Sequence, residues 1–211
     1  MLKQDLHLLP MRQRVYQAKL VFYLFLASLG MFFLASMLTY LIVRNQAFHG
    51  IQNPVPNSIA TQGPATYQAL SLPSSFWAST IVLVGVSIAL HFACYMVRRE
   101  RQKEFRWCLV IAAVAATAFV VTQFFGLSDL LGTHFSADDG STKVYGMSFT
   151  LSFIHALHVI GGMIFLGYVM HHGFRSRYHH EQHYAVDNCA SYWHFLDVVW
   201  ACMLVTFLIT R

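Results

Sequence analysis

Residues 145–162 read YGMSFTLSFIHALHVIGG, and residues 191–200 read SYWHFLDVVW. These two stretches decide the fold, because each lies in an apolar run of membrane-spanning length, at residues 147–170 and 191–210. Polar side chains inside such runs are costly to bury, so each requires a hydrogen-bond partner or a function. The polar residues of both stretches are therefore the first candidates for functional or structural roles.

Those polar residues are spaced to share helix faces. His155 and His158 are three apart, as are His194 and Asp197, so each pair lies on one face of its helix. We expect both pairs to point into a helix bundle and not toward lipid. With single polar residues from two other apolar runs, the candidate polar residues of the bundle are His91, Gln123, His155, His158, Trp193, His194 and Asp197.

The composition is that of an integral membrane protein. Of the 211 residues, 56% are hydrophobic and only 11% are charged, which argues against a soluble globular domain. Each of five apolar runs is long enough to cross a hydrocarbon core of about 30 Å. We therefore predict one all-α membrane domain over residues 1–211, with spans at residues 20–43, 74–97, 107–131, 147–170 and 191–210.

The distribution of charge predicts the orientation. Eleven Lys and Arg residues lie before the first run or in the second and fourth connections, whereas three lie in the segments of the opposite side. Cytoplasmic segments of membrane proteins carry such an excess, so we expect a multi-pass protein with a cytoplasmic N-terminus and an external C-terminus. The net charge of +5 is thus explained by membrane topology and not by binding of nucleic acid.

Further expectations concern packing and polar partners. Small residues at Ala27, Ser28, Gly30, Ala35 and Ser36 predict the packing face of the first span. Asp197 should be satisfied by His91 or His194, and Gln123 should hydrogen-bond His155 or His158, since unpaired buried polar groups are heavily penalised. The four cysteines form no Cys-x-x-Cys motif and predict neither a disulfide framework nor a metal site; Cys189 is expected in a cytoplasmic loop.

The two stretches resemble a known family. The series Tyr-Gly-x-x-Phe from residue 145, His-x-x-His-Val-x-x-Gly from residue 155 and Tyr-Trp-His-Phe-x-Asp-x-x-Trp from residue 192 is similar to the last two helices of subunit III of haem–copper terminal oxidases. A looser resemblance extends over the first helix, Leu72-Pro73 and Gln123. Five spans resemble the short prokaryotic form of that subunit, which places the chain in the inner membrane of a prokaryote. Leu29 stands where family members commonly have a buried carboxylate, so roles that depend on that acid are not carried over.

The resemblance implies an accessory role in an enzyme that reduces dioxygen to water and pumps protons. It implies that this chain carries no catalytic, cofactor or metal residues, because the haems and copper belong to subunit I and, in cytochrome c oxidases, to subunit II. Subunits I and II, small subunits and bound phospholipid are the implied partners. The implied roles are support of the catalytic subunit and of proton uptake. Whether cytochrome c or a quinol donates the electrons is left open.

Two other functions remain as alternatives. A haem-binding electron carrier would use histidines such as His158 and His172, which lie about 21 Å apart along one helix. No second helix supplies a matching pair of histidines. A proton-coupled transporter would use Asp197 and the histidines, but the five spans show no internal repeat.

Overall fold

The computed structural model describes residues 11–52, 75–136, 139–175 and 184–209, and five helices account for nearly all of them. The helices are α2 (Met11–Gln52), α3 (Ser75–Arg98), α4 (Gln102–Ser136), α5 (Asp139–Phe174) and α6 (Tyr184–Ile209). Each contains a segment long and apolar enough to cross a membrane, which confirms the predicted all-α architecture with five spans.

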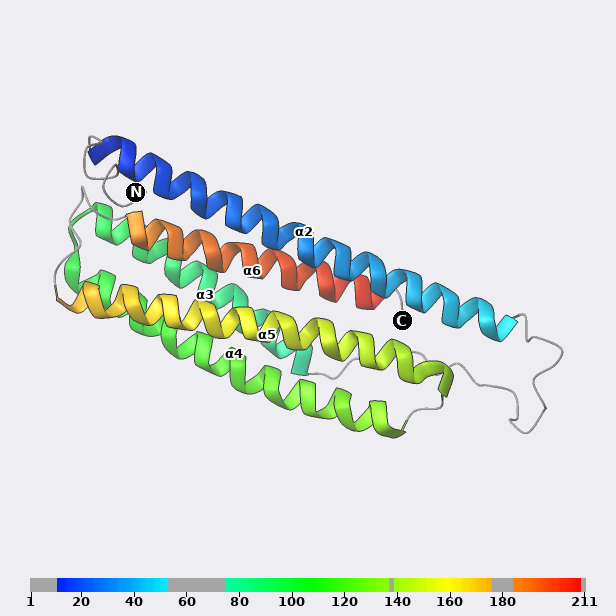
Figure 1. Ribbon diagram of the computed structural model, residues 1–211. Coiled ribbons are helices and arrows are strands. Elements are labelled where there is room, and N and C mark those ends of the chain that lie inside the picture. Colours follow the sequence, from blue (N-terminus) through cyan, green and yellow to red (C-terminus); the bar gives the residue numbers. More distant parts are fainter. Residues whose placement is uncertain (1–10, 53–74, 137–138, 176–183, 210–211) are drawn as a thin grey trace.

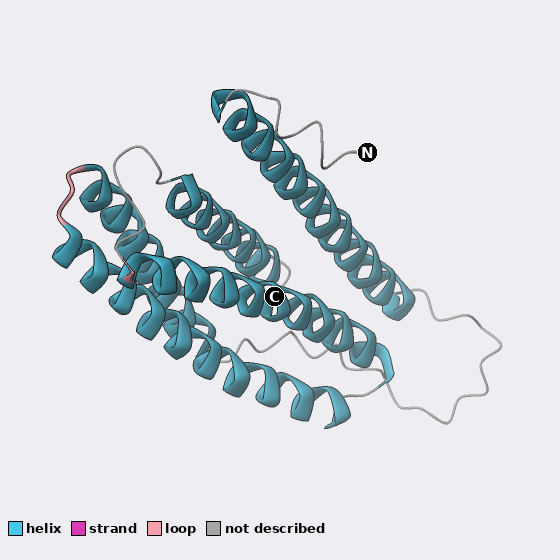
Figure 2. Cartoon of the chain, turned by 60° about the vertical axis from the view of Figure 1, so that its left-hand side comes forward, coloured by secondary structure: helices cyan, strands magenta, loops and turns pink. Residues whose placement is uncertain are grey.

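The helices run up and down in one elongated bundle (Figure 1). Helix α6 contacts α2, α3 and α5, while α4 closes the bundle between α3 and α5. Figure 2 shows α2 lying along one side of the other helices. Because α6 has helices on three sides, it buries the largest share of its span and forms the centre of the molecule.

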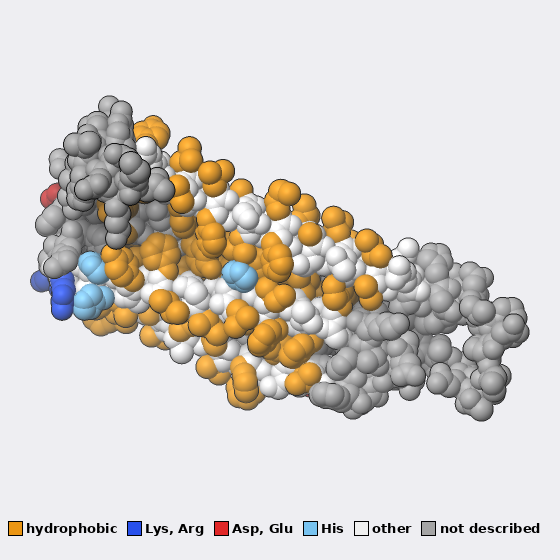
Figure 3. Space-filling view, in the orientation of Figure 1, with side chains coloured by type: hydrophobic (Ala, Val, Ile, Leu, Met, Phe, Trp, Pro, Cys, Tyr) orange, Lys and Arg blue, Asp and Glu red, His pale blue; other side chains and the backbone are white. Residues whose placement is uncertain are grey.

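Most of the charged side chains of the described residues lie at one end of the bundle, and we call it the charged end. It contains the start of α2, the turn between α3 and α4, and the start of α6 (Figure 1). Lys and Arg side chains gather there, while hydrophobic side chains cover the length of the visible face (Figure 3). The α3–α4 turn lies at the opposite end of α3 from the connection that leads into Ser75, as the alternating topology requires.

The α3–α4 turn is closed by a Schellman motif. The Arg101 amide donates to the Met96 carbonyl at 3.1 Å, and the Glu100 amide donates to the Val97 carbonyl at 3.2 Å. Glu100 adopts the left-handed conformation, with φ 59°, at the position where glycine is the usual residue. The turn is therefore short and well defined, and it fixes the antiparallel pairing of α3 and α4.

The packing face of α2 differs from the predicted one. The buried row follows large side chains, Leu26, Leu29, Phe33, Met37 and Tyr40, at spacings of three or four residues. Of the predicted small residues, Ala27, Ser28 and Ala35 are exposed. Gly30 approaches another helix, with its Cβ position 3.4 Å from the Phe195 ring. Large side chains fill the space between α2 and its neighbours, so close approach of backbones is not required along the whole helix.

Helix α6 begins earlier than predicted. It starts at Tyr184, seven residues before the predicted span, so Asp197 lies about 20 Å from its first residue and not about 9 Å. Cys189 is consequently a fully buried helical residue, and its predicted place in a loop was wrong. The added turns bring Asp187 level with the end of α3, where it meets Arg98.

Candidate functional site

A row of polar residues lies along the contact between α3 and α6, and we call it the polar seam. The two helices run antiparallel. From the charged end inward, residue numbers therefore fall along α3 and rise along α6. On α3 the polar residues lie on one helical face because their spacings are three, four and seven. The seam consists of Arg98, Cys94, His91, Ser87 and Thr80 on α3, and of Asp187, Ser191, His194, Asp197 and Trp200 on α6.

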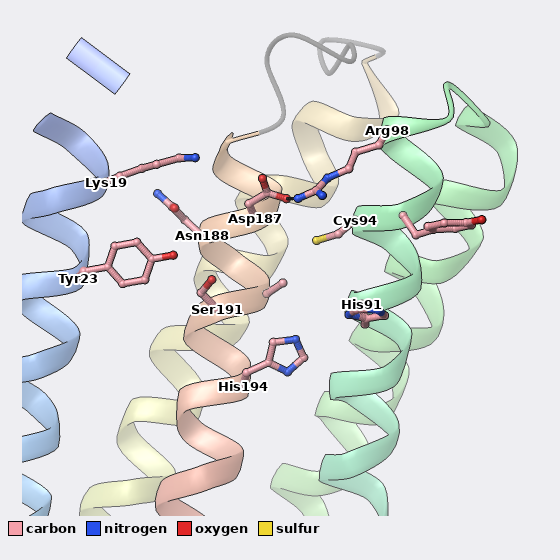
Figure 4. Close-up of a pocket in the computed structure, with 11 residues that line it drawn as sticks. Lys19, Tyr23, His91, Cys94, Arg98, Asp187, Asn188, Ser191 and His194 are labelled. Carbon is pink, nitrogen blue, oxygen red and sulfur yellow. Dashed lines mark hydrogen bonds and ion pairs between the residues drawn. The ribbon is translucent and has the colours of Figure 1, made fainter. Parts of the chain in front are cut away.

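The outer part of the seam borders a groove at the charged end. An Arg98 guanidinium nitrogen lies 3.1 Å from a carboxylate oxygen of Asp187, and Cys94 Sγ lies 3.8 Å from the Val186 carbonyl oxygen. The groove has a volume of about 410 Å³. Figure 4 shows α2 contributing Lys19 and Tyr23 from the side opposite α3. Helix α6 forms the floor of the groove. The lining includes the cations of Lys19 and Arg98, the carboxylate of Asp187 and apolar side chains.

Two histidines line the deep part of this groove. The rings of His91 and His194 lie 6.5 Å apart, centroid to centroid (Figure 4). His91 is exposed at the groove, so it is not the buried bundle residue that its place in an apolar run suggested. His194 is half-buried and is the histidine that faces inward.

Asp197 lies one turn deeper than His194. The Ser87 hydroxyl lies beside its carboxyl group and also contacts Nδ1 of His194. We expected His91 or His194 to satisfy Asp197, but its polar neighbour is Ser87 and neither of the two histidines. Oδ1 of Asp197 is buried without a hydrogen-bond partner among the described residues.

The seam ends at Thr80 and Trp200. Trp200 Nε1 donates to Thr80 Oγ1 at 3.0 Å, and Thr80 Oγ1 in turn donates to the Phe76 carbonyl at 2.7 Å. The Trp200 side chain is almost completely buried. This contact holds α3 and α6 together in the half of the bundle that lies away from the charged end.

Replacing Thr80 with valine should destabilise the protein by about 1–3 kcal/mol, because the buried indole N–H of Trp200 loses its acceptor while the shape is kept. The thermal unfolding midpoint of the purified protein would measure the effect. Thr117→Val is the matched control, since the exposed Thr117 hydroxyl bonds only a carbonyl of its own helix. Equal midpoints for the two variants would show that the Thr80–Trp200 contact contributes nothing.

His155 is enclosed by aromatic rings. It is fully buried and stacks on Trp200 with centroids 5.3 Å apart, and Phe33 and Phe119 approach it edge-on. Neither ring nitrogen has a hydrogen-bond partner among the described residues. Its immediate surroundings are therefore those of a packed core histidine.

Gln123 faces α5 but makes no hydrogen bond to either histidine. Its side chain is 2% exposed, and it lines a small apolar hollow together with Phe153 and Ala156 of α5. Both polar atoms of the amide are without partners among the described residues, so the predicted bond to His155 or His158 was wrong. The aromatic rings around His155 take the place that the amide was expected to fill.

His158 and Trp193 help to join α5 to α6. His158 Nδ1 lies 2.8 Å from the Ile154 carbonyl oxygen, and the Tyr192 hydroxyl donates to the His158 carbonyl at 2.9 Å. Trp193 is fully buried beside Gly162, where an added Cβ would lie 3.3 Å from the indole. These two positions thus serve helix packing.

Leu29 is buried in the core, at the position where the resemblance places an acid. The next residue, Gly30, lies against Phe195 of α6. Near this level of the bundle, Asp197 is the acid that the described helices contribute.

Sequence reasoning missed Ser87, Thr80 and the hydroxyl of Tyr192. A signal for the first two was present, because Thr80, Ser87 and His91 follow one another at spacings of seven and four on a single helix face. The partner of that face was not evident from the sequence.

Comparison with known proteins gives a consistent result. The family model described as cytochrome c oxidase subunit III matches residues 13–210. Cytochrome c oxidase subunit 3 of Pylaiella littoralis is 30% identical over 184 residues, which are 87% of this chain and 63% of the relative. The Lumbricus terrestris protein of the same name is 26% identical over 181 residues, 85% of this chain and 65% of the relative.

A third relative, cytochrome c oxidase subunit 3 of Oryctolagus cuniculus, is 30% identical over 129 residues, 61% of this chain and 47% of the relative. In these comparisons the chain spans between 47% and 65% of the relatives' length. The match therefore concerns a shared portion of longer proteins.

Proposed function

Because the chain belongs to the cytochrome c oxidase subunit III family, we propose that it is an accessory subunit of a respiratory haem–copper oxidase that reduces dioxygen to water. The observation that carries the proposal is the family match, which extends from the first helix to the last and includes the polar seam. The proposed partners are the haem- and copper-bearing catalytic subunit, the second subunit and membrane lipid. The three relatives are eukaryotic, so the prokaryotic origin stays a prediction.

The proposed role is to brace the catalytic subunit within the membrane. Helix α6 is covered by three neighbours, whereas large apolar side chains on α2, α4 and α5 are exposed. Phe32 and Leu34 on α2, for example, are about half exposed, and a partner helix or lipid would cover them. These faces give the subunit a large apolar area for contact in the bilayer.

The outer end of the groove, beside Lys19 and Arg98, is the proposed place for a phospholipid headgroup. Lys19 and Arg98 line its opposite walls, and both cations suit a lipid phosphate. Tyr23 and Tyr95 add the amphipathic rings that commonly lie at the level of lipid headgroups. We propose that the charged end, with its excess of Lys and Arg, faces the cytoplasm, so that such a lipid lies in the cytoplasmic leaflet. The same surface, with its basic groups and histidines, is where this chain would support proton uptake.

Isolation of the complex tests the assignment. The chain, tagged and extracted from membranes with a mild detergent, should bring with it a haem- and copper-containing partner in a fixed ratio. An unrelated tagged membrane protein from the same cells serves as control and should bring none. Recovery of the chain without any haem protein would contradict the proposal, and stoichiometric haem in the chain alone would favour the electron-carrier alternative.

A further inference from the structure

We propose that the polar seam is a proton path, open at the charged end, that leads to a proton-binding site at Asp197 inside the membrane span. The inference stands on the α3–α6 contacts of this chain alone and does not depend on the oxidase assignment. It assigns to Asp197 a function that neither packing nor subunit contact requires.

The outer part of the path is the groove itself. Its lining provides a succession of groups that bind water or protons, ending with His91 and His194 in its deep part (Figure 4). A volume of about 410 Å³ accommodates several water molecules, each of which needs about 30 Å³. Water in contact with the charged end therefore reaches the imidazole of His194.

The inner part of the path consists of three side chains in sequence. His194 contacts the Ser87 hydroxyl through Nδ1, and the same hydroxyl lies beside the Asp197 carboxyl. A hydroxyl both donates and accepts hydrogen bonds, and an imidazole does so through its two nitrogens, so this order permits transfer of a proton in either direction. Asp187 and Asp197 are ten residues apart on α6, which corresponds to a path of about 15 Å along the helix.

The surroundings of Asp197 favour the proton-bearing form. The Arg98–Asp187 and Arg101–Glu104 ion pairs lie at the charged end, away from Asp197. An ionised carboxylate without a paired cation is strongly disfavoured in an apolar medium. One proton delivered from a hydronium ion in the groove converts the carboxylate to the neutral acid and leaves one water molecule.

The titratable groups on the helices packed against α6 do not provide that cation. Helix α3 presents His91, whose ring is exposed and lies 6.5 Å from that of His194. Helix α5 presents His158, which bonds its own helix through Nδ1, and His155, which stacks on Trp200. Helix α2 presents Leu29 and Gly30 near this level. His194, linked through Ser87, is thus the titratable neighbour that communicates with Asp197.

The path ends at Asp197 and does not cross the membrane. The next polar contact is the one between Trp200 and Thr80, and an indole N–H donates hydrogen bonds but cannot accept a proton. The Thr80 hydroxyl is itself engaged with the Phe76 carbonyl. The site consequently binds and releases protons on one side only.

Infrared difference spectroscopy of the full-length chain in lipid nanodiscs tests the proposal. Near neutral pH the wild-type spectrum minus that of Asp197→Asn should contain one C=O band of a protonated carboxyl group, and this band should shift after transfer to D₂O. Ser87→Ala should keep the band but slow its exchange by about tenfold, the effect expected when an ordinary hydrogen bond is lost from a transfer path. Circular dichroism would establish that each variant keeps its helices.

Two controls separate the path from general effects. Ser128→Ala removes a hydroxyl that bonds a carbonyl of its own helix, so the exchange rate should equal that of the wild type. Asp129→Asn removes an exposed carboxyl from the last turns of α4 and should leave the band in place. Absence of the band from the wild-type difference spectrum at every pH examined would overturn the proton-binding site, and wild-type exchange in Ser87→Ala would overturn the path.

Discussion

An oxidase from which this chain has been removed should keep its haem spectrum and its initial turnover within a small factor, yet lose activity faster during sustained turnover. Reduction of dioxygen requires a metal at the reacting oxygen and a route for electrons. The bundle histidines of this chain are engaged otherwise: His155 packs among aromatic rings, His158 bonds a backbone carbonyl and His194 contacts Ser87. On the proposed function, the chain would contribute to the environment of the catalytic subunit more than to the reaction.

Removal should accelerate inactivation because two supports are lost together. The apolar faces of the bundle no longer cover the partner, and lipid is no longer held in the groove beside Lys19 and Arg98. Oxygen consumption followed over many turnovers, with and without the chain, measures the effect. Adding the purified chain back should restore the longer lifetime. Loss of the haem spectrum on removal, or an unchanged rate of inactivation, would contradict the proposed accessory role.

Gly162→Leu should cause the largest loss of stability among single substitutions considered, by about 1–3 kcal/mol or more, because it overpacks the contact between α5 and α6. A Cβ at this position would lie 3.0 Å from a Tyr192 ring carbon and 3.3 Å from two Trp193 ring carbons. Trp193 is fully buried, and tightly packed interiors yield little to added volume. The further atoms of leucine would force the two helices apart.

The thermal unfolding midpoint and the amount of chain recovered from membranes would both measure this effect. Gly167→Leu is the matched control, since it makes the same change on the same helix where an added Cβ meets nothing within 4 Å. The gain in helix propensity is equal at the two positions, so the difference between the variants isolates the steric effect. Equal stability and recovery for both would show that the α5–α6 contact at Gly162 is not close.

The five spans and their alternating order could be predicted from the sequence because the membrane restricts the choice of structure. Backbone polar groups must be satisfied within each apolar segment, so a run of about twenty apolar residues becomes a helix whatever its neighbours are. The family resemblance could also be recognised from the sequence, since the residues around His155 and Asp197 form a specific pattern in an otherwise apolar sequence. Length and chemical type of residues were sufficient for both conclusions.

The contacts between helices were decided only by the tertiary structure. In an apolar bundle nearly every face is hydrophobic, so the sequence did not reveal that α2 packs through Leu26 and Phe33 and not through its small residues. Nor did it reveal that Asp197 meets Ser87, because that contact depends on the rotation and axial register of α3 against α6. Rotation and register follow from the fit of many side chains at once, whereas the existence of a membrane helix follows from the hydrophobicity of its own residues.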